Sequence, residues 1–279
     1  MTLLEGAIIL VAGIAAGIIN VVAGAGTLIT FPVLLAFGVP PITANVSNTV
    51  GLVPGSVAGA SGYRRELASQ WRPVAVMAVF SAIGGIIGGL LLLVLPEEVF
   101  AGVVPYLLLL AALLSAIQPR VAAFVRRKAT VATAGQRPAT TAETPTTDAT
   151  DATAKTSKTD TRPITLGLIL GVLATGVYGG YFGAAQGVIL LALLGILWST
   201  DMHRSNGAKN VLAGVANLVS ATIFITSGTV DWRIAILIGV GSASGGWLGA
   251  HIGRRLSAPV LRTILVIVAV IAAVVLFVT

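Results

Sequence analysis

Cysteine is absent from this sequence of 279 residues, and charged residues are scarce. The absence of cysteine excludes disulfide bonds, thiolate metal ligands and cysteine nucleophiles. Only 10% of the residues are Asp, Glu, Lys or Arg, while 56% are hydrophobic. Because about a quarter of a typical soluble domain is charged, this composition argues against a soluble fold.

Long stretches of the chain carry no charge at all. Residues 6 to 63 contain no Asp, Glu, Lys or Arg, and neither do residues 73 to 96, 99 to 119 and 163 to 200. Apolar stretches of this length are typical of helices that cross a lipid bilayer. We therefore predict an all-α integral membrane protein, a polytopic helical bundle whose principal partner is the lipid bilayer.

The residues that catalysis needs are also missing. The two histidines, His203 and His251, have no acidic partner at a useful spacing, and no HExxH, GxSxG or phosphate-loop motif is present. No Asp or Glu lies inside an apolar stretch, where it could relay protons. We expect no enzyme activity, no catalytic residue, no cofactor and no metal site.

The formal net charge of +7 comes from short clusters of Arg and Lys between the apolar stretches. Clusters of this kind are typical of the loops that set membrane topology, whereas a nucleic-acid-binding protein gathers its cations on a soluble domain. We therefore expect no nucleic-acid partner. Because the first apolar stretch lacks the basic start of a signal peptide, we read it as a mature helix.

A polar region divides the chain into three parts. Residues 129 to 162 are rich in Thr, Ala and Pro with scattered charges, which predicts a disordered linker on the cytoplasmic side. Residues 1 to 128 and 163 to 279 would then form two transmembrane units. The expected location is the plasma membrane, with the N-terminus outside.

The two units are related by an internal repeat. An offset of 161 positions aligns Asn45 with Asn206 and the pair Trp71-Arg72 with Trp232-Arg233, and it also superposes the glycines at 84, 85 and 88 on those at 245, 246 and 249. Near the start of each unit the offset becomes 159, which aligns Gly24 with Gly183. Matches of this kind indicate a duplication. The glycines are expected to be helix-packing faces and the two tryptophans interfacial anchors.

Each unit divides into five segments, at residues 3–23, 26–38, 43–62, 73–95 and 99–118, and at residues 163–183, 186–198, 205–227, 233–252 and 258–278. The second segment of each unit is too short to cross a hydrocarbon core of about 30 Å. We expect about eight full spans and two short half-helices or re-entrant pieces.

The charges of the loops indicate that the two units have opposite orientations. Glu97 and Glu98 lie between segments four and five of the first unit, but Arg254 and Arg255 lie between the same segments of the second. If basic loops face the cytoplasm, the two units are inverted repeats, as five insertions per unit would produce.

The short segments are where a binding site is expected, because irregular backbone at membrane depth survives only where it is buried or lines a cavity. Gly24, Gly26 and Thr27 precede or open the first short segment, and Gln186 opens its counterpart. Small residues there would expose N–H groups at the positive end of a half-helix, which favours an anion. The glycines could equally serve close helix packing.

The polar stretches that follow supply further candidates. The repeat pairs Asn45 with Asn206, Asn48 with Lys209, and Thr49 with Asn210. Amides, hydroxyls and one ammonium group suit a small oxyanion. Alternatively, these side chains cap the third segments, with Lys209 extending to the cytoplasmic interface. Weaker lining candidates are Asn20, Tyr178, Tyr181 and Asn217.

Residues 24 to 32 (GAGTLITFP), 43 to 51 (TANVSNTVG), the arginine-containing loop at 62 to 72 and residues 179 to 187 (GGYFGAAQG) together resemble the sulfite exporter TauE/SafE family of bacterial membrane proteins. The resemblance implies a permease for small anions such as sulfite, sulfonates or related organic anions. The second unit departs from the pattern, with Leu190 near where a proline would be expected.

Two classes of function follow. The first is a transporter that moves a small anionic solute by alternating access between the two units. The second is a non-transporting accessory or structural protein, in which the polar groups only hold helices together. The sequence is compatible with a homo-oligomer, and it predicts the class of substrate but not the individual compound.

Overall fold

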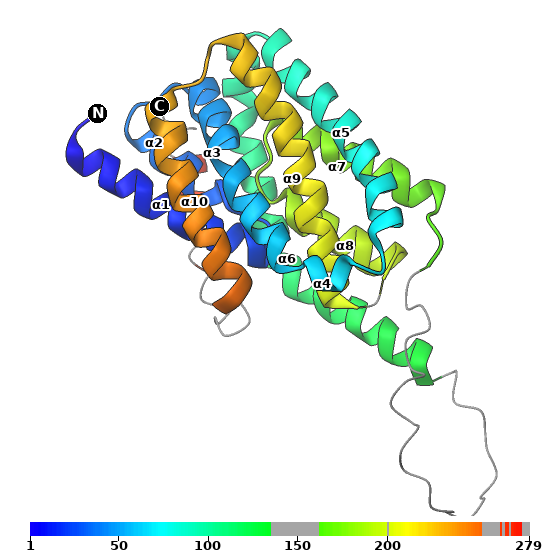
Figure 1. Cartoon of the computed structure of the whole chain (residues 1–279). Coiled ribbons are helices and arrows are strands. Elements are labelled where there is room, and N and C mark those ends of the chain that lie inside the picture. The colour runs from blue at the N-terminus through cyan, green and yellow to red at the C-terminus, as the bar shows by residue number, and fades with distance from the viewer. Residues whose placement is uncertain (135–161, 200, 253–262, 264–265, 268, 275–279) are drawn as a thin grey trace, which may run out of the picture.

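The computed structural model describes residues 1–134, 162–199, 201–252, 263, 266–267 and 269–274. The described chain is a bundle of helices (Figure 1). The helices are α1 (Leu3–Ala23), α2 (Thr27–Ala36), α3 (Pro41–Gly62), α4 (Arg64–Leu67), α5 (Trp71–Val94), α6 (Glu97–Ala134), α7 (Leu166–Tyr181), α8 (Gln186–Leu197), α9 (Met202–Ser227) and α10 (Trp232–Ile252).

Five helices contain a stretch that is long and apolar enough to cross a membrane, namely α1, α5, α6, α9 and α10. The helices α2, α7 and α8 are apolar but shorter, and α3, with 22 residues, is long enough but carries many polar side chains. The multi-pass helical fold is therefore confirmed. The number of full spans stays a prediction, because most of the last predicted segment lies outside the described residues.

The helix α6 is longer than its predicted segment, since it continues to Ala134 in the first part of the predicted linker. Residues 135–161, the rest of that linker, lie outside the described part of the chain. The pair Arg254-Arg255, whose charge predicts the orientation of the second unit, lies outside it as well.

The two units pack mainly against each other. α1 of the first unit lies along α10 of the second, and α7 of the second unit lies along α5 of the first. In the same way α3 lies along α10, and α9 lies along α5. Each unit thus completes the other, so that neither forms a separate bundle.

The contacts between the units recur in matching pairs. Ser81 Oγ donates a hydrogen bond of 2.8 Å to the Leu212 carbonyl, and Ser242 Oγ donates one of 2.6 Å to the Gly51 carbonyl. The offset of 161 relates Ser81 to Ser242 and Gly51 to Leu212. The same hydrogen bond therefore forms twice, once from the first unit to the second and once from the second unit to the first.

The glycines predicted to be packing faces repeat this exchange. A Cβ atom at Gly84 would lie 2.4 Å from the Leu173 carbonyl oxygen, and one at Gly245 would lie 2.0 Å from the Ile14 carbonyl oxygen. Residues 14 and 173 are related by the offset of 159. The packing role of both glycines is confirmed, because any side chain there would overlap the neighbouring backbone.

Candidate functional site

The two interruptions between helices meet in the interior of the protein. α1 ends at Gly24, whose φ of 74° is left-handed, and α8 begins after Gly183 and Ala185, with φ values of 75° and 58°. The Gly187 N–H donates a hydrogen bond of 3.1 Å to the Gly24 carbonyl. We call this region, residues 24–27 and 183–187, the joint.

The joint allows no side chain between its two backbones. A Cβ atom on Gly24 would lie 2.3 Å from Gly187 Cα, and one on Gly187 would lie 2.4 Å from Gly24 Cα. Glycine is therefore required at Gly24 twice, once by its left-handed φ and once by the approach of the other unit.

Lys209 lies beside the joint and is buried. Its side chain is in the interior, since the residue is only 1% exposed. Nζ donates hydrogen bonds of 3.2 Å and 2.9 Å to the carbonyls of Asn20 and Val21, in the last turn of α1. The Asn20 carbonyl also accepts a hydrogen bond of 2.9 Å from the Gly24 N–H. Both carbonyls lie at the C-terminal end of α1, which carries the negative end of the helix dipole.

The alternative in which Lys209 extends to the interface is therefore wrong. The position of Lys209 in α9 explains why. The helix begins at Met202, so Lys209 is two turns inside a helix that packs against the other unit. Among the described residues, no carboxylate lies within salt-bridge distance of its ammonium group.

Asn206 reaches the same helix end from one turn earlier in α9. Its Nδ2 donates to the Val21 carbonyl at 3.3 Å and to the Tyr63 hydroxyl at 2.8 Å. We call Asn206, Lys209, Tyr63 and the carbonyls of Asn20 and Val21 the α9 cluster. Asn20 also donates from Nδ2 to Ser56 Oγ, at 3.4 Å, which ties the cluster to α3.

The repeat-related side chains of the first unit form the α3 cluster, which consists of Asn45, Asn48, Thr27 and Thr30. Asn48 Nδ2 donates to Thr27 Oγ1 at 3.2 Å, and its Oδ1 accepts a hydrogen bond from Thr30 Oγ1. Asn45 Nδ2 donates to the Tyr181 carbonyl, at the end of α7, at 2.9 Å. Asn45 and Asn206 therefore each bind the last turn of the first helix of the opposite unit.

The alternative in which these polar residues cap their helices is also wrong. The N-cap of α3 is Pro40, and the N-cap of α9 is Asp201, whose side chain accepts from the N–H groups of His203 and Arg204. Asn45 and Asn206 lie within the helices, where the main-chain groups are already paired. Their side chains are free to bind other elements.

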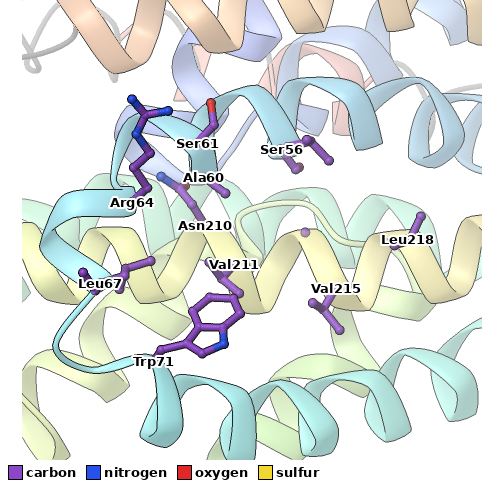
Figure 2. A pocket seen from close by; sticks show the side chains of 13 residues that line it. Ser56, Ala60, Ser61, Arg64, Leu67, Trp71, Asn210, Val211, Val215 and Leu218 are labelled. Atoms are coloured by element: carbon purple, nitrogen blue, oxygen red, sulfur yellow. The ribbon is translucent and has the colours of Figure 1, made fainter.

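The remaining predicted residues are placed as follows. Thr49 Oγ1 donates to the Asn45 carbonyl of its own helix at 2.9 Å. Gln186, at the start of α8, is 2% exposed and packs against Gly179. Asn210 is on another face of α9, in a groove beside α3 and α4 (Figure 2). The structure thus brings most of the predicted residues together around the joint, whereas Thr49 binds its own helix and Asn210 lines a separate groove.

Several of these side chains have buried polar atoms without a hydrogen-bond partner among the described residues. They include Asn45 Oδ1, Gln186 Nε2, Asn206 Oδ1 and Asn210 Nδ2, all from residues predicted to bind substrate. An unsatisfied buried polar group costs about 1–3 kcal/mol, so these four atoms would each be stabilised by a further hydrogen-bond partner.

Sequence reasoning missed three residues, namely Thr30, Ser56 and Tyr63. Thr30 is one helical turn after Thr27, so a helical reading of residues 26–38 could have placed both on one face. Ser56 and Tyr63 carry no such signal, because their partners belong to α1 and α9. The weaker candidate Tyr178 donates from its hydroxyl to the Ala184 carbonyl at 2.5 Å and so supports the joint.

The model of the family described as Sulfite exporter TauE/SafE matches residues 9–276. A protein of Sinorhizobium sp, named Probable membrane transporter protein ORF9, is 25% identical over 95% of this chain and 89% of its own length. A Probable membrane transporter protein of Haemophilus influenzae is 23% identical over 94% of this chain and 90% of its own. No solved structure matches the chain.

Proposed function

Since the chain belongs to the sulfite exporter TauE/SafE family of membrane transporters, we propose that it moves small anions across the plasma membrane. Sulfite, sulfonates and related organic anions are the proposed substrates. The proposed site is the joint with the two clusters beside it, at the boundary between the two units.

The observation that carries this proposal is the burial of Lys209 without a described acidic partner. A buried cation is costly unless it is paired. The two carbonyls that hold Nζ satisfy hydrogen bonds but supply only partial negative charge. An anionic substrate would provide the missing counter-charge, so the site favours an anion over a neutral or cationic solute.

Neutral groups would complete the coordination. Gln186 Nε2 is a buried donor without a described partner, and it lies at the start of α8, where the helix dipole is positive. The free Oδ1 atoms of Asn45 and Asn206 are acceptors. They would bind a hydroxyl group of an organic anion or a water molecule that accompanies it.

We propose that the two units are inverted and exchange access to this site by moving against each other. The matching contacts of Ser81 with Leu212 and of Ser242 with Gly51 support a two-fold relation between the units. In Figure 1, α2 and α8 lie toward opposite ends of the bundle, which is the arrangement an inverted pair would give.

Cysteine labelling tests the inversion cleanly, because the natural chain has no cysteine. Ala68 and Thr229 are related by the offset of 161, and both are exposed. A membrane-impermeant thiol reagent is expected to label Thr229→Cys from outside the cell, and Ala68→Cys only after the membrane is opened. Labelling of both positions from the same side would contradict the inversion.

Flux into proteoliposomes tests the function. The reconstituted chain is expected to take up sulfite or a sulfonate with saturation, and Lys209→Met is expected to lose this uptake. Arg72→Gln is the matched control, because it also removes one cation but from an exposed position outside the site. Absence of flux for every sulfur oxyanion, sulfonate and carboxylate would favour the accessory protein, and non-saturating flux would indicate a channel.

A further inference from the structure

Two cavities adjoin at the end of the bundle where α3 ends and α5 begins. One, of about 690 Å³, lies over α9 between α3, α4 and α5. The other, of about 720 Å³, lies between α4 and the last turns of α10. Ser61 and Arg64 line both cavities, so the two share a wall.

The first cavity is an apolar groove. In Figure 2 it runs along α9 from Leu67 and Trp71 past Val211 and Val215 to Leu218. Val57 and Leu218, on its sides, are 62% and 50% exposed, which leaves large aliphatic surfaces without a described partner. A groove of this composition on a membrane protein matches the hydrocarbon part of a lipid.

The second cavity is polar and basic. Arg64 and Arg65 line it from α4, and Trp247 and His251 line it from α10. The two rings pack together with centroids 4.6 Å apart. In Figure 2 the Arg64 guanidinium group turns away from Val215 and Leu218 at the far end of the apolar groove.

Neither arginine of the second cavity has an ion-pair partner among the described side chains. Trp71 and Trp247 are 58% and 57% exposed on either side of them. Exposed indoles are typical of the membrane–water interface, the level at which lipid phosphates lie.

We propose that an anionic phospholipid binds here, with its phosphate between Arg64 and Arg65 and one acyl chain in the apolar groove along α9. Guanidinium groups bind phosphate through two parallel hydrogen bonds, and basic pockets between helices are suited to anionic head groups. This site is separate from the joint, and the proposal does not depend on anion transport.

The pair of cavities favours an amphiphile over other ligands. A free anion would account for the arginines but would leave the groove empty, because Val57, Val215 and Leu218 give it nothing to bind. A neutral phospholipid would fill the groove equally well, but its head group has no net negative charge and would gain less from the two arginines. Of these three ligands, only a lipid with a net negative head group matches both the apolar groove and the basic cavity.

Native mass spectrometry on the purified full chain tests the proposal, with phosphatidylglycerol and phosphatidylcholine of identical acyl chains as probes. The wild type is expected to retain phosphatidylglycerol on the order of tenfold more strongly than phosphatidylcholine. Arg64→Gln with Arg65→Gln is expected to abolish that preference. Arg72→Gln, an exposed arginine that lines neither cavity, is the matched control and should keep it.

A second variant separates the head group from the tail. Val57→Trp places a large ring in the groove from an exposed position, so folding is preserved, and it is expected to weaken binding of both lipids. Equal retention of the two lipids by the wild type would overturn the proposal. So would an unchanged preference in the double arginine variant, or competition by glycerol 3-phosphate that Val57→Trp does not alter, which would indicate a site for free anions.

Discussion

The α3 cluster and the α9 cluster occupy equivalent places in the two units but differ in charge. Asn45 and Asn206 play the same part, each donating to the last turn of the first helix of the opposite unit. The next pair differs, because Asn48 is neutral and Lys209 is cationic. Asn48 binds Thr27 and Thr30 within its own unit, whereas Lys209 reaches the carbonyls of the other unit.

This difference indicates which residues stabilise the structure and which would bind the anion. Asn45 and Asn206 each hold the two units together at one helix end. The ammonium group of Lys209 has no counterpart at Asn48, so the second unit would bind the charge of the anion. A site of this kind is approximately symmetric in shape but asymmetric in electrostatics.

A substitution in the joint, which both clusters contact, should lower the stability of the protein the most. Gly24→Ala is expected to lower the free energy of unfolding by about 3 kcal/mol or more, because it combines a strained left-handed φ with overlap on the backbone of Gly187. Gly38→Ala is the control, since Gly38 has the same φ of 74° but open space around it. It should cost about 1–2 kcal/mol. Thermal unfolding in detergent measures both. Equal losses of stability in the two variants would show that the close contact between Gly24 and Gly187 does not contribute to stability.

The second largest effect is expected from removing the charge of Lys209, and the comparison is with its repeat equivalent Asn48. Lys209→Met is expected to reduce anion uptake more than about tenfold. The protein should stay folded, because the Asn20 and Val21 carbonyls keep their hydrogen bonds from Gly24 and Asn206. Asn48→Leu should instead mainly destabilise, by about 1–3 kcal/mol, since it leaves the hydroxyls of Thr27 and Thr30 without their partner. Uptake and thermal unfolding of the two variants separate these outcomes. Similar uptake by both would remove the distinction between the clusters.

The sequence predicted the framework better than the electrostatics. The repeat aligned Asn45 with Asn206, and its packing glycines at Gly84 and Gly245 are confirmed. The burial of Lys209 could not be predicted, because the carbonyls that hold it end a helix of the other unit, 188 residues away along the chain for Val21. For the same reason, no local pattern could bring Gly24 against Gly187.

The shared asparagines should give a smaller and graded effect. Among the described residues, the Asn206 side chain donates two hydrogen bonds, to Val21 and Tyr63, while the Asn45 side chain donates one, to Tyr181. Asn206→Leu is therefore expected to destabilise more than Asn45→Leu, by about 1 kcal/mol, the typical net value of one hydrogen bond. Thermal unfolding of the two variants measures the difference. A larger loss for Asn45→Leu would contradict this ordering.

Thr49 and Asn210, the third repeat-related pair, should have the smallest effect on uptake and stability. Thr49→Val removes a hydroxyl whose one hydrogen bond among the described residues is to its own helix, so uptake should stay within about twofold and stability within about 1 kcal/mol. Asn210→Leu removes a buried donor without a described partner in an apolar groove, and should be neutral or slightly stabilising. A strong loss of uptake in Asn210→Leu would move the substrate path into that groove.

Anion binding at Lys209 is most directly tested by ligand-dependent thermal stability of the purified chain. A ligand that binds the folded protein raises its apparent unfolding temperature by mass action. A small sulfonate is expected to raise that temperature for the wild type and for Arg72→Gln, while the uncharged sulfonamide of the same shape does not. Lys209→Met is expected to show no rise with either compound. A rise in Lys209→Met equal to that of the wild type would contradict the assignment of the buried cation as the anion-binding group.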